Sequence, residues 1–195
     1  MIKRTLFVLL LAGLMFAPIG LFAQKAYNAN IGGFNRIILD MSETGEGIGM
    51  PKKVVTNIPK VGVTLVPNEA NNTVYEKLEI APHNMGGTNA NPQLHATGSP
   101  MPWTDGDTRC RGLNYNGGGG WRLPTQREMI MIWIFRDALV NLGSTPFTVT
   151  GSGYWTATEF GVGNALTVNF DNGGCGLSNY PNPISFYIRC VRELP

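Results

Sequence analysis

The sequence has few charged residues. They make up 14% of its 195 residues, 15 being basic and 13 acidic. Two of the basic residues, Lys3 and Arg4, lie in an N-terminal segment that we expect to be removed, which leaves the two signs in balance. Nucleic acids and anionic membranes are held mainly by clustered Lys and Arg. We therefore expect neither of them as a partner of this chain.

Potential metal ligands are also scarce. The chain has three cysteines, Cys110, Cys175 and Cys190, and only two histidines, His83 and His95. No two cysteines have the spacing of a zinc site, and both histidines fall in stretches typical of loops. In an exported chain two of the cysteines are expected to form a disulfide, and sequence alone permits three pairings. We predict no metal and no cofactor.

The longest apolar run lies at the N-terminus. Residues 6–14 follow a basic start and precede the small residue Ala23. This order is typical of a secretory signal peptide over residues 1–23, and the run is too short for a membrane anchor. Retention as an N-terminal anchor is the alternative. We expect an exported protein, extracellular, on the cell surface or periplasmic, with no membrane span once the signal is removed.

Residues 24–72 form a polar segment with short pieces that favour strands, at 34–41, 52–58 and 61–67. Gly and Pro separate these pieces and exclude a helix. Two interpretations stay open: a small three-stranded sheet, or an extended stalk whose strands pair with another molecule. The segment is too small to bury a core of its own.

Residues 73–195 make up the second predicted domain. A strand beginning near residue 74 ends at Pro82, residues 88–100 are typical of a long loop, and residues 102–114 predict a short helix with Thr104 as its N-cap. After Gly143, strands are predicted at 146–151, 153–159, 165–173 and 185–194, with a turn at 171–174. The order of elements indicates an α+β fold.

The stretch GGGGWRLPTQREM, residues 117–129, has two interpretations: a phosphate-binding loop or a structural corner. Phosphate loops need a Lys and a Ser or Thr directly after the glycines, and neither follows here. Thr125 and Glu128 instead have the spacing of a capping box, which predicts a helix from Gln126 to a stop at Gly143. Seven consecutive apolar residues, 129–135, predict that this helix is largely buried.

Several of these segments together resemble a known family. GGWRLPTQREM, GYWTATE, VNFDNG and YIRCVRE, preceded by MPWTDGDTRCRGLN, are similar to the C-terminal domain of bacterial collagen-like surface adhesins, which also occurs in fimbria-associated proteins. The resemblance covers roughly residues 74–194. It implies a C-type-lectin-like fold, in which two helices pack on a small twisted antiparallel sheet with long loops and the domain ends lie close together. It also implies a disulfide between Cys110 and Cys190, with Cys175 left over.

Specific sugar-binding and catalytic motifs of related folds are missing. The chain has no Glu-Pro-Asn, Gln-Pro-Asp or Trp-Asn-Asp motif, so calcium-dependent sugar binding of the lectin type is not indicated. No serine stands in a nucleophile-elbow context, and the two cysteines of the expected bridge are not available for formylglycine-type chemistry. The acids near loops are Asp105, Asp107, Glu159 and Asp171, and a glycosidase carboxylate pair among them stays open. We predict that the protein is not an enzyme.

Our leading hypothesis is a secreted or cell-surface binding module, an adhesin or fimbrial accessory subunit that recognises a glycan or a protein. Aromatic rings and amides in the loops between strands suit such ligands. The candidate residues are Trp155, Glu159, Asn164, Asn172, Asn179 and Tyr180. For Trp155 and Tyr180 the alternative is core packing, which we favour for Trp155. A second hypothesis is a structural subunit of a surface assembly that uses residues 24–72 for strand pairing; an enzyme related to the formylglycine-generating superfamily is the third.

Overall fold

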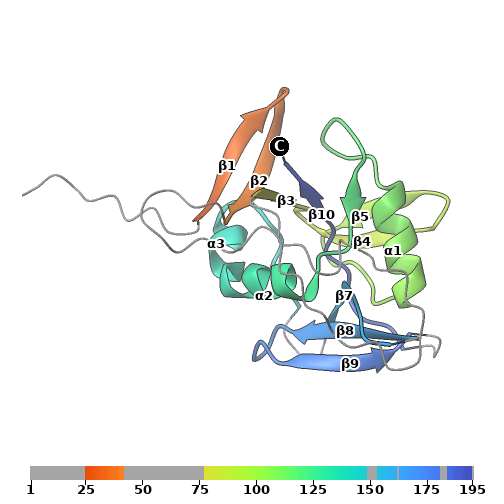
Figure 1. Ribbon diagram of the computed structural model, residues 1–195. Coiled ribbons are helices and arrows are strands. Elements are labelled where there is room, and N and C mark those ends of the chain that lie inside the picture. Colours follow the sequence, from red (N-terminus) through yellow and green to blue (C-terminus); the bar gives the residue numbers. More distant parts are fainter. Residues whose placement is uncertain (1–24, 42–76, 149–152, 162, 181–183, 195) are drawn as a thin grey trace, which may run out of the picture.

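A computed structural model describes residues 25–41, 77–148, 153–161, 163–180 and 184–194. The predicted signal peptide and the predicted strands at 52–58 and 61–67 lie outside these ranges. Within them the chain forms three helices and ten strands, arranged in three antiparallel sheets (Figure 1). The fold is α+β, as the sequence predicts.

The largest sheet has five strands in the order β1-β2-β3-β10-β6. They are β1 (Lys25–Ile31), β2 (Phe34–Asp40), β3 (Lys77–Ile80), β10 (Val191–Glu193) and β6 (Trp121–Arg122). At the end of the β3–β10 ladder, the amide of Leu194 donates to the carbonyl of Lys77 at 3.0 Å. The two ends of the domain are therefore adjacent, as the family resemblance implies.

The N-terminal segment joins this sheet as a hairpin. Strands β1 and β2 are connected by Gly32 and Gly33, whose φ angles of 63° and 83° suit a tight turn between antiparallel strands. β2 confirms the strand predicted at 34–41, whereas β1 was not predicted. Because β2 pairs directly with β3, the described part of the segment does not stand as a sheet of its own. The domain boundary at residue 73 remains a prediction.

Two smaller sheets complete the fold. β4 (Asn84–Gly87) pairs with β5 (Pro92–His95), and a three-stranded sheet contains β7 (Gly153–Glu159), β8 (Asn164–Asn169) and β9 (Cys175–Asn179). The prediction of one long loop at 88–100 is wrong, because β5 lies within it. The described part of the strand predicted at 146–151 is not a strand, and the last predicted strand is reduced to β10 and isolated bridges at Phe186 and Tyr187.

The helices are α1 (Trp103–Gly112), α2 (Gln126–Ile134) and α3 (Arg136–Asn141). α1 begins two residues earlier than predicted: Pro102 rather than Thr104 is its N-cap, and Thr104 lies inside the first turn. α2 begins at Gln126 as predicted, and its capping box is present in both directions between Thr125 and Glu128. The local capping signal therefore placed this helix start correctly.

The single helix predicted from Gln126 to Gly143 is interrupted at Phe135, which leaves the helical conformation with φ −91° and ψ 5°. Nη1 of Arg136 donates to the carbonyl of Trp133 at 2.9 Å, which satisfies a carbonyl at the break. Burial is also less complete than predicted, since Ile134 is 54% exposed. Gly143, with φ 102°, ends α3 in the left-handed conformation that was expected.

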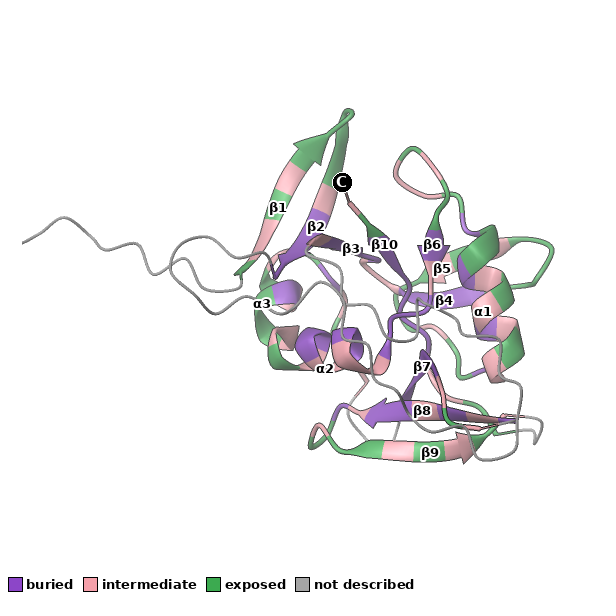
Figure 2. Ribbon diagram, viewed as in Figure 1, coloured by how far each residue is buried: buried purple, intermediate pink, exposed green. Residues whose placement is uncertain are grey.

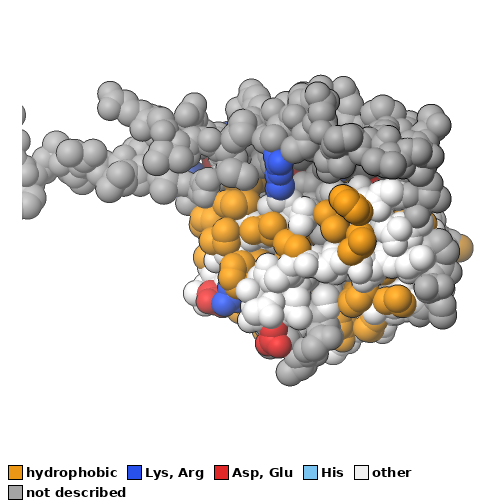
Figure 3. Space-filling model, turned by 60° about the horizontal axis from the view of Figure 1, so that its bottom comes forward, with side chains coloured by type: hydrophobic (Ala, Val, Ile, Leu, Met, Phe, Trp, Pro, Cys, Tyr) orange, Lys and Arg blue, Asp and Glu red, His pale blue; other side chains and the backbone are white. Residues whose placement is uncertain are grey.

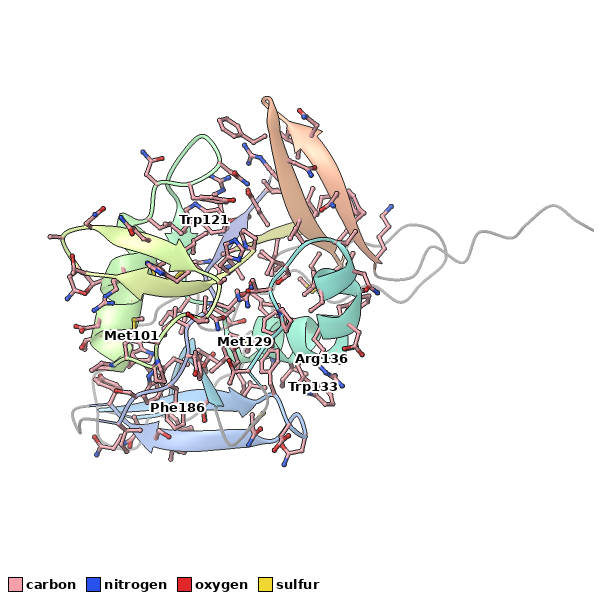
Figure 4. The ribbon with its side chains drawn as sticks, turned by 180° about the vertical axis from the view of Figure 1, so that it is seen from behind. Met101, Trp121, Met129, Trp133, Arg136 and Phe186 are labelled. Carbon is pink, nitrogen blue, oxygen red and sulfur yellow. A yellow bond between two sulfur atoms is a disulfide. The ribbon has the colours of Figure 1, made fainter. Side chains whose placement is uncertain are left out.

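The buried hydrophobic residues form two clusters, and the buried parts of the ribbon are purple in Figure 2. The first contains Met129 of α2 and residues of β2, β3 and β8; the second contains Met101 and Trp121 and lies beside α1. Figure 4 shows Met129 and Trp133 on one side of the molecule, with Met101 and Phe186 on the other. Strand β7 lies between the clusters, because Tyr154 packs in the first and Trp155 in the second.

The disulfide expected from the family resemblance lies in the second cluster. Cys110 of α1 is bonded to Cys190, their Cα atoms are 5.6 Å apart, and both side chains are fully buried. The third cysteine, Cys175, is not part of this bridge. It is exposed and begins β9, directly after the turn predicted at 171–174.

The glycine-rich stretch is a corner that presents carbonyl oxygens to arginine. Nη1 of Arg192 donates to the carbonyls of Gly118 and Gly119 at 3.1 and 3.2 Å, and Nη2 donates to the carbonyl of Asn116 at 3.2 Å. The same guanidinium lies over the Trp121 ring, 4.7 Å from its centroid. A phosphate loop presents amide groups to an anion. The contacts here are of opposite polarity, and they agree with the structural interpretation.

Candidate functional site

Four of the six candidate residues lie at one end of the three-stranded sheet. Asn164 is the cross-strand partner of Asn179, and Glu159 is the partner of Ala165. The amide of Tyr180 donates to the carbonyl of Gly163 at 2.9 Å, which holds Tyr180 at the same end. We call these four residues, together with Trp103 and Asp107 of α1, the sheet-end surface.

The sheet-end surface has two sides. Direct cross-strand partners project from the same face of a sheet, so the amides of Asn164 and Asn179 lie side by side. Glu159 pairs with the residue next to Asn164, and it therefore projects from the opposite face, where α1 lies. The surface thus combines an amide side with an α1 side around one rim of the sheet.

An aromatic pair forms part of the α1 side. The rings of Trp103 and Tyr180 are stacked, with centroids 4.7 Å apart and planes inclined by 24°. Nε1 of Trp103 donates to the carbonyl of Thr156 at 2.8 Å, which fixes the indole against β7. Both residues are partly buried. Sequence reasoning noted Trp103 only as a helix residue; nothing in a single sequence indicated that it lies against Tyr180.

Two carboxylates accompany the aromatic pair. Burial raises the pKa of Glu159, and the negative charge of Asp107 raises it further. Asp107 is itself paired with Arg111 one helical turn later, with Nε to Oδ2 at 2.8 Å. The effect of Asp107 on Glu159 indicates that the two carboxylates lie close together, which makes this side of the surface favourable for neutral or cationic groups rather than for anions.

Trp155 does not belong to this surface. Its ring is fully buried, its Nε1 donates to the carbonyl of Met101 at 3.0 Å, and it packs edge-on against Phe186 at 4.8 Å. A side chain without exposed area has no contact with a ligand at the surface. The prediction of a ligand contact is therefore wrong for Trp155, and the alternative of core packing is correct.

Asn172 lies at the other end of the same sheet, in the turn between β8 and β9. It is exposed, and its Oδ1 accepts from the amide of Gly174 at 2.8 Å, which closes the turn. Asn172 is thus separated from the other candidates by the length of β9. It is a natural comparison position for experiments on the sheet-end surface.

The surface over β8 and β9 carries apolar and uncharged side chains, with few charged ones (Figure 3). Leu177 of β9 is 53% exposed and Phe160, just after β7, is 51% exposed. No group of three or more His, Cys, Asp or Glu side chains in the described ranges is arranged to hold a metal ion. The chemistry offered here is stacking, apolar contact and neutral hydrogen bonding.

Comparison with known proteins assigns the chain to a family. No curated protein matches the chain. Among the described residues, no helix has the length and apolar character needed to cross a membrane. A family model described as the Lcl C-terminal domain matches residues 76–192, from β3 to β10 and thus more than half of the chain. The chain belongs to the Lcl C-terminal domain family, which confirms the resemblance to collagen-like surface proteins at the level of the family.

Proposed function

We propose that this protein is an exported surface binding module, an adhesin or fimbrial accessory subunit, and that its ligand contacts the sheet-end surface. The observation that carries the proposal is the gathering of a stacked Trp103–Tyr180 pair with Glu159, Asn164 and Asn179 at one rim of a sheet. Membership of a family of collagen-like surface proteins supports it. So does the buried disulfide, since such bonds persist in oxidising compartments outside the cytosol.

The chemistry of the sheet-end surface limits the class of ligand that it suits. Aromatic rings offer apolar area for the faces of sugar rings, and amide groups both donate and accept hydrogen bonds with hydroxyl groups. The carboxylates of Asp107 and Glu159 disfavour sulfated or other anionic polymers. We infer a neutral glycan or the uncharged part of a glycoprotein as the ligand class.

We also infer that the domain has a C-type-lectin-like fold. Three features support this: α1 is bonded by a disulfide to the segment before the last strand, the first and last strands of the domain pair with each other, and the chain between them forms a separate antiparallel sheet.

An array of glycans and glycoproteins tests the function. The chain from residue 24 onward should bind one or more neutral glycans, and Tyr180→Ala should weaken that binding by about tenfold, since one aromatic contact contributes about 0.5–1.5 kcal/mol beyond its buried area. Asn179→Ala tests the amide side separately. Loss with Tyr180→Ala alone places the ligand on the α1 side, and loss with both variants places it across the rim.

Asn172→Asp is the matched control, because it keeps the Oδ1 acceptor of the turn at the opposite end of the sheet. Its binding should equal that of the unsubstituted chain. Absence of binding by the folded chain to any polymer on the array would contradict the adhesin proposal. Binding that survives both site variants and is lost in the control would place the ligand elsewhere.

A structural role in a surface assembly is the second candidate, and the position of the hairpin favours it. The β1–β2 hairpin comes from outside the matched family domain, yet it occupies the edge of β3. Its strand β2 is already paired within its own chain, so the hairpin does not offer β2 as a free strand. Participation in an assembly would instead require exchange of the hairpin.

A further inference from the structure

The β1–β2 hairpin completes the core of the domain, although it lies outside the residues that the family model matches. The family match begins at residue 76, after the hairpin, and β3 and β10 both lie inside it. Ile37 and Leu39 of β2 are 7% and 0% exposed and pack in the same cluster as Leu78 and Ile80 of β3. Without the hairpin these β3 side chains would form an uncovered apolar sheet edge.

We propose that this edge of β3 is an assembly surface, and that it accepts the β1–β2 hairpin of a second copy of the chain in place of its own. The proposal deepens the structural role described above and does not depend on ligand binding. Exchange of an identical element between copies is a low-cost route to oligomers because both arrangements contain the same contacts. Reciprocal exchange gives a closed dimer, and one-way exchange gives an open chain of subunits.

The length of the connection permits exchange. Asp40 at the end of β2 is the cross-strand partner of Lys77 at the start of β3, and 36 residues, 41 to 76, separate them in the sequence. A stretch of this length can span at most about 120–130 Å, whereas a domain of this size has a radius of gyration of about 14 Å. A two-residue turn would suffice to join the strands within one copy. The connection can therefore reach a neighbouring copy.

Specific polar contacts join the hairpin to the rest of the domain, but the buried carboxylate that takes part in them also has a partner within the domain. Nη1 of Arg36 donates to Oε2 of the buried Glu79 at 3.0 Å, and Nη2 donates to the carbonyl of Asn116 at 3.2 Å. Glu79 is also paired with Arg192 of β10, whose Nε donates to the same oxygen at 3.0 Å. Glu79 thus keeps an arginine partner when the hairpin leaves, which avoids an uncompensated buried carboxylate.

The hairpin stands at the margin of the molecule, with its turn directed away from the helices and from the three-stranded sheet (Figure 1). Besides the β2–β3 ladder, its specific anchor on the helical layer is Nδ2 of Asn28, which donates to the carbonyl of Leu142 at 3.0 Å. A hairpin placed at the edge leaves and returns without crossing another part of the fold. The same position in a second copy is equally accessible.

Position-specific crosslinking tests the exchange. In a Cys175→Ser background, Asp40→Cys and Lys77→Cys are introduced into separate full-length chains, which are mixed in equal amounts, unfolded under conditions that keep the Cys110–Cys190 bridge, and refolded together at high concentration. Oxidation should join position 40 of one chain to position 77 of another. Only dimers with one chain of each kind carry both cysteines, and random pairing makes about half of the exchanged dimers of this kind. Peptide mapping identifies the bond.

The chain that carries both substitutions is the matched control, since it shows whether the two positions can form a disulfide within one copy. If it crosslinks while the mixture yields no bond between positions 40 and 77, the proposal is wrong. If it does not crosslink, sedimentation velocity of the refolded Cys175→Ser chain decides. A dimer that increases with protein concentration and is reduced by Leu39→Ala supports exchange, and a monomer at every concentration overturns it. Neither outcome affects the glycan array result.

Discussion

Arg189 is a fully buried cation that is surrounded by neutral acceptors. Its guanidinium donates to Oδ1 of Asn84 at 3.0 Å, to Oγ of Ser144 at 2.9 Å and to the carbonyl of Ala81 at 3.0 Å, and it lies 4.3 Å from the centroid of the Phe147 ring. Burial lowers its pKa to about 10. Arg189 therefore stays charged at neutral pH, and its field acts on neighbouring side chains.

His83, on which the charge of Arg189 acts, makes the stability of the protein depend on pH. Burial lowers the pKa of His83, and the charge of Arg189 lowers it further. The unfolded chain then binds a proton more readily than the folded chain, so the free energy of unfolding decreases as the pH falls below the ordinary histidine value of about 6.5. Chemical denaturation from about pH 7.5 to 5.5 should show this decrease, and His83→Gln should reduce it.

His95→Gln serves as the comparison for this experiment, because His95 is exposed on β5. Its substitution should leave the slope of stability against pH unchanged. Equal loss of slope in the two variants would contradict the assignment to His83. A difference of opposite sign between the slopes of the unsubstituted protein and His83→Gln would show that the imidazole gains, rather than loses, affinity for its proton on folding.

At the level of single elements, the start of α2 combines a cap with a buried ion pair. Glu128 is fully buried; its Oε2 accepts from the amide of Thr125 at 2.8 Å, and its two oxygens accept from Arg122 at 2.8 and 2.9 Å. Glu128→Gln removes the buried charge and the two-oxygen carboxylate contact with Arg122. We expect a loss of about 2–4 kcal/mol in the free energy of unfolding.

Asp137→Asn is the control for this prediction. Asp137 is 90% exposed and lies 3.9 Å from Arg136 on α3, so its substitution should cost less than about 0.5 kcal/mol. Urea unfolding of both variants at neutral pH gives the comparison. Equal losses would show that the pair of Arg122 and Glu128 contributes no more than a surface ion pair.

The elements that the sequence predicts correctly are those with a local chemical signal. Thr125 and Glu128 determine a helix start within four residues, and the start of α2 is correct. The end of α2 at Phe135 carries no glycine or proline, so the sequence gives no local signal for the break. Strand β9 contains Gly176 and Ser178, which do not favour strands, and it forms because β8 offers a paired edge.

In the candidate site, too, the features with a local signal in the sequence differ from those that depend on the fold. Strand β7 is buried on both faces, since Tyr154 packs in one cluster and Trp155 in the other. Its sequence therefore gives no alternation that distinguishes an exposed ring from a core ring. Tyr180 and Asn179 lie at the rim of the three-stranded sheet. Trp103, which stacks on Tyr180, is 77 positions away from it in the sequence, and only the fold brings the two rings together.

At the scale of the whole molecule, the disulfide closes a loop of 80 residues between α1 and the last strand. In the chain-entropy model such a bond stabilises the folded state by about 4 kcal/mol. We expect the double variant Cys110→Ala/Cys190→Ala to lose about 2–4 kcal/mol of unfolding free energy in denaturant titrations. Cys175→Ser, at an exposed position, should lose less than about 0.5 kcal/mol. Equal stability of the double variant and the unsubstituted protein would contradict this role.

The pairing of β3 with β10 has a mechanical consequence for a domain under tension. Because Lys77 and Leu194 are hydrogen-bonded at the same end of the ladder, a force that pulls these two ends apart breaks the pairs one at a time, starting from Glu193 and Leu78. After Val191 the force reaches Cys190, which is covalently tied to Cys110. A stretched molecule should thus first extend by a short distance at low force. The force should then rise steeply once the disulfide bears it, and a reducing agent should abolish this rise.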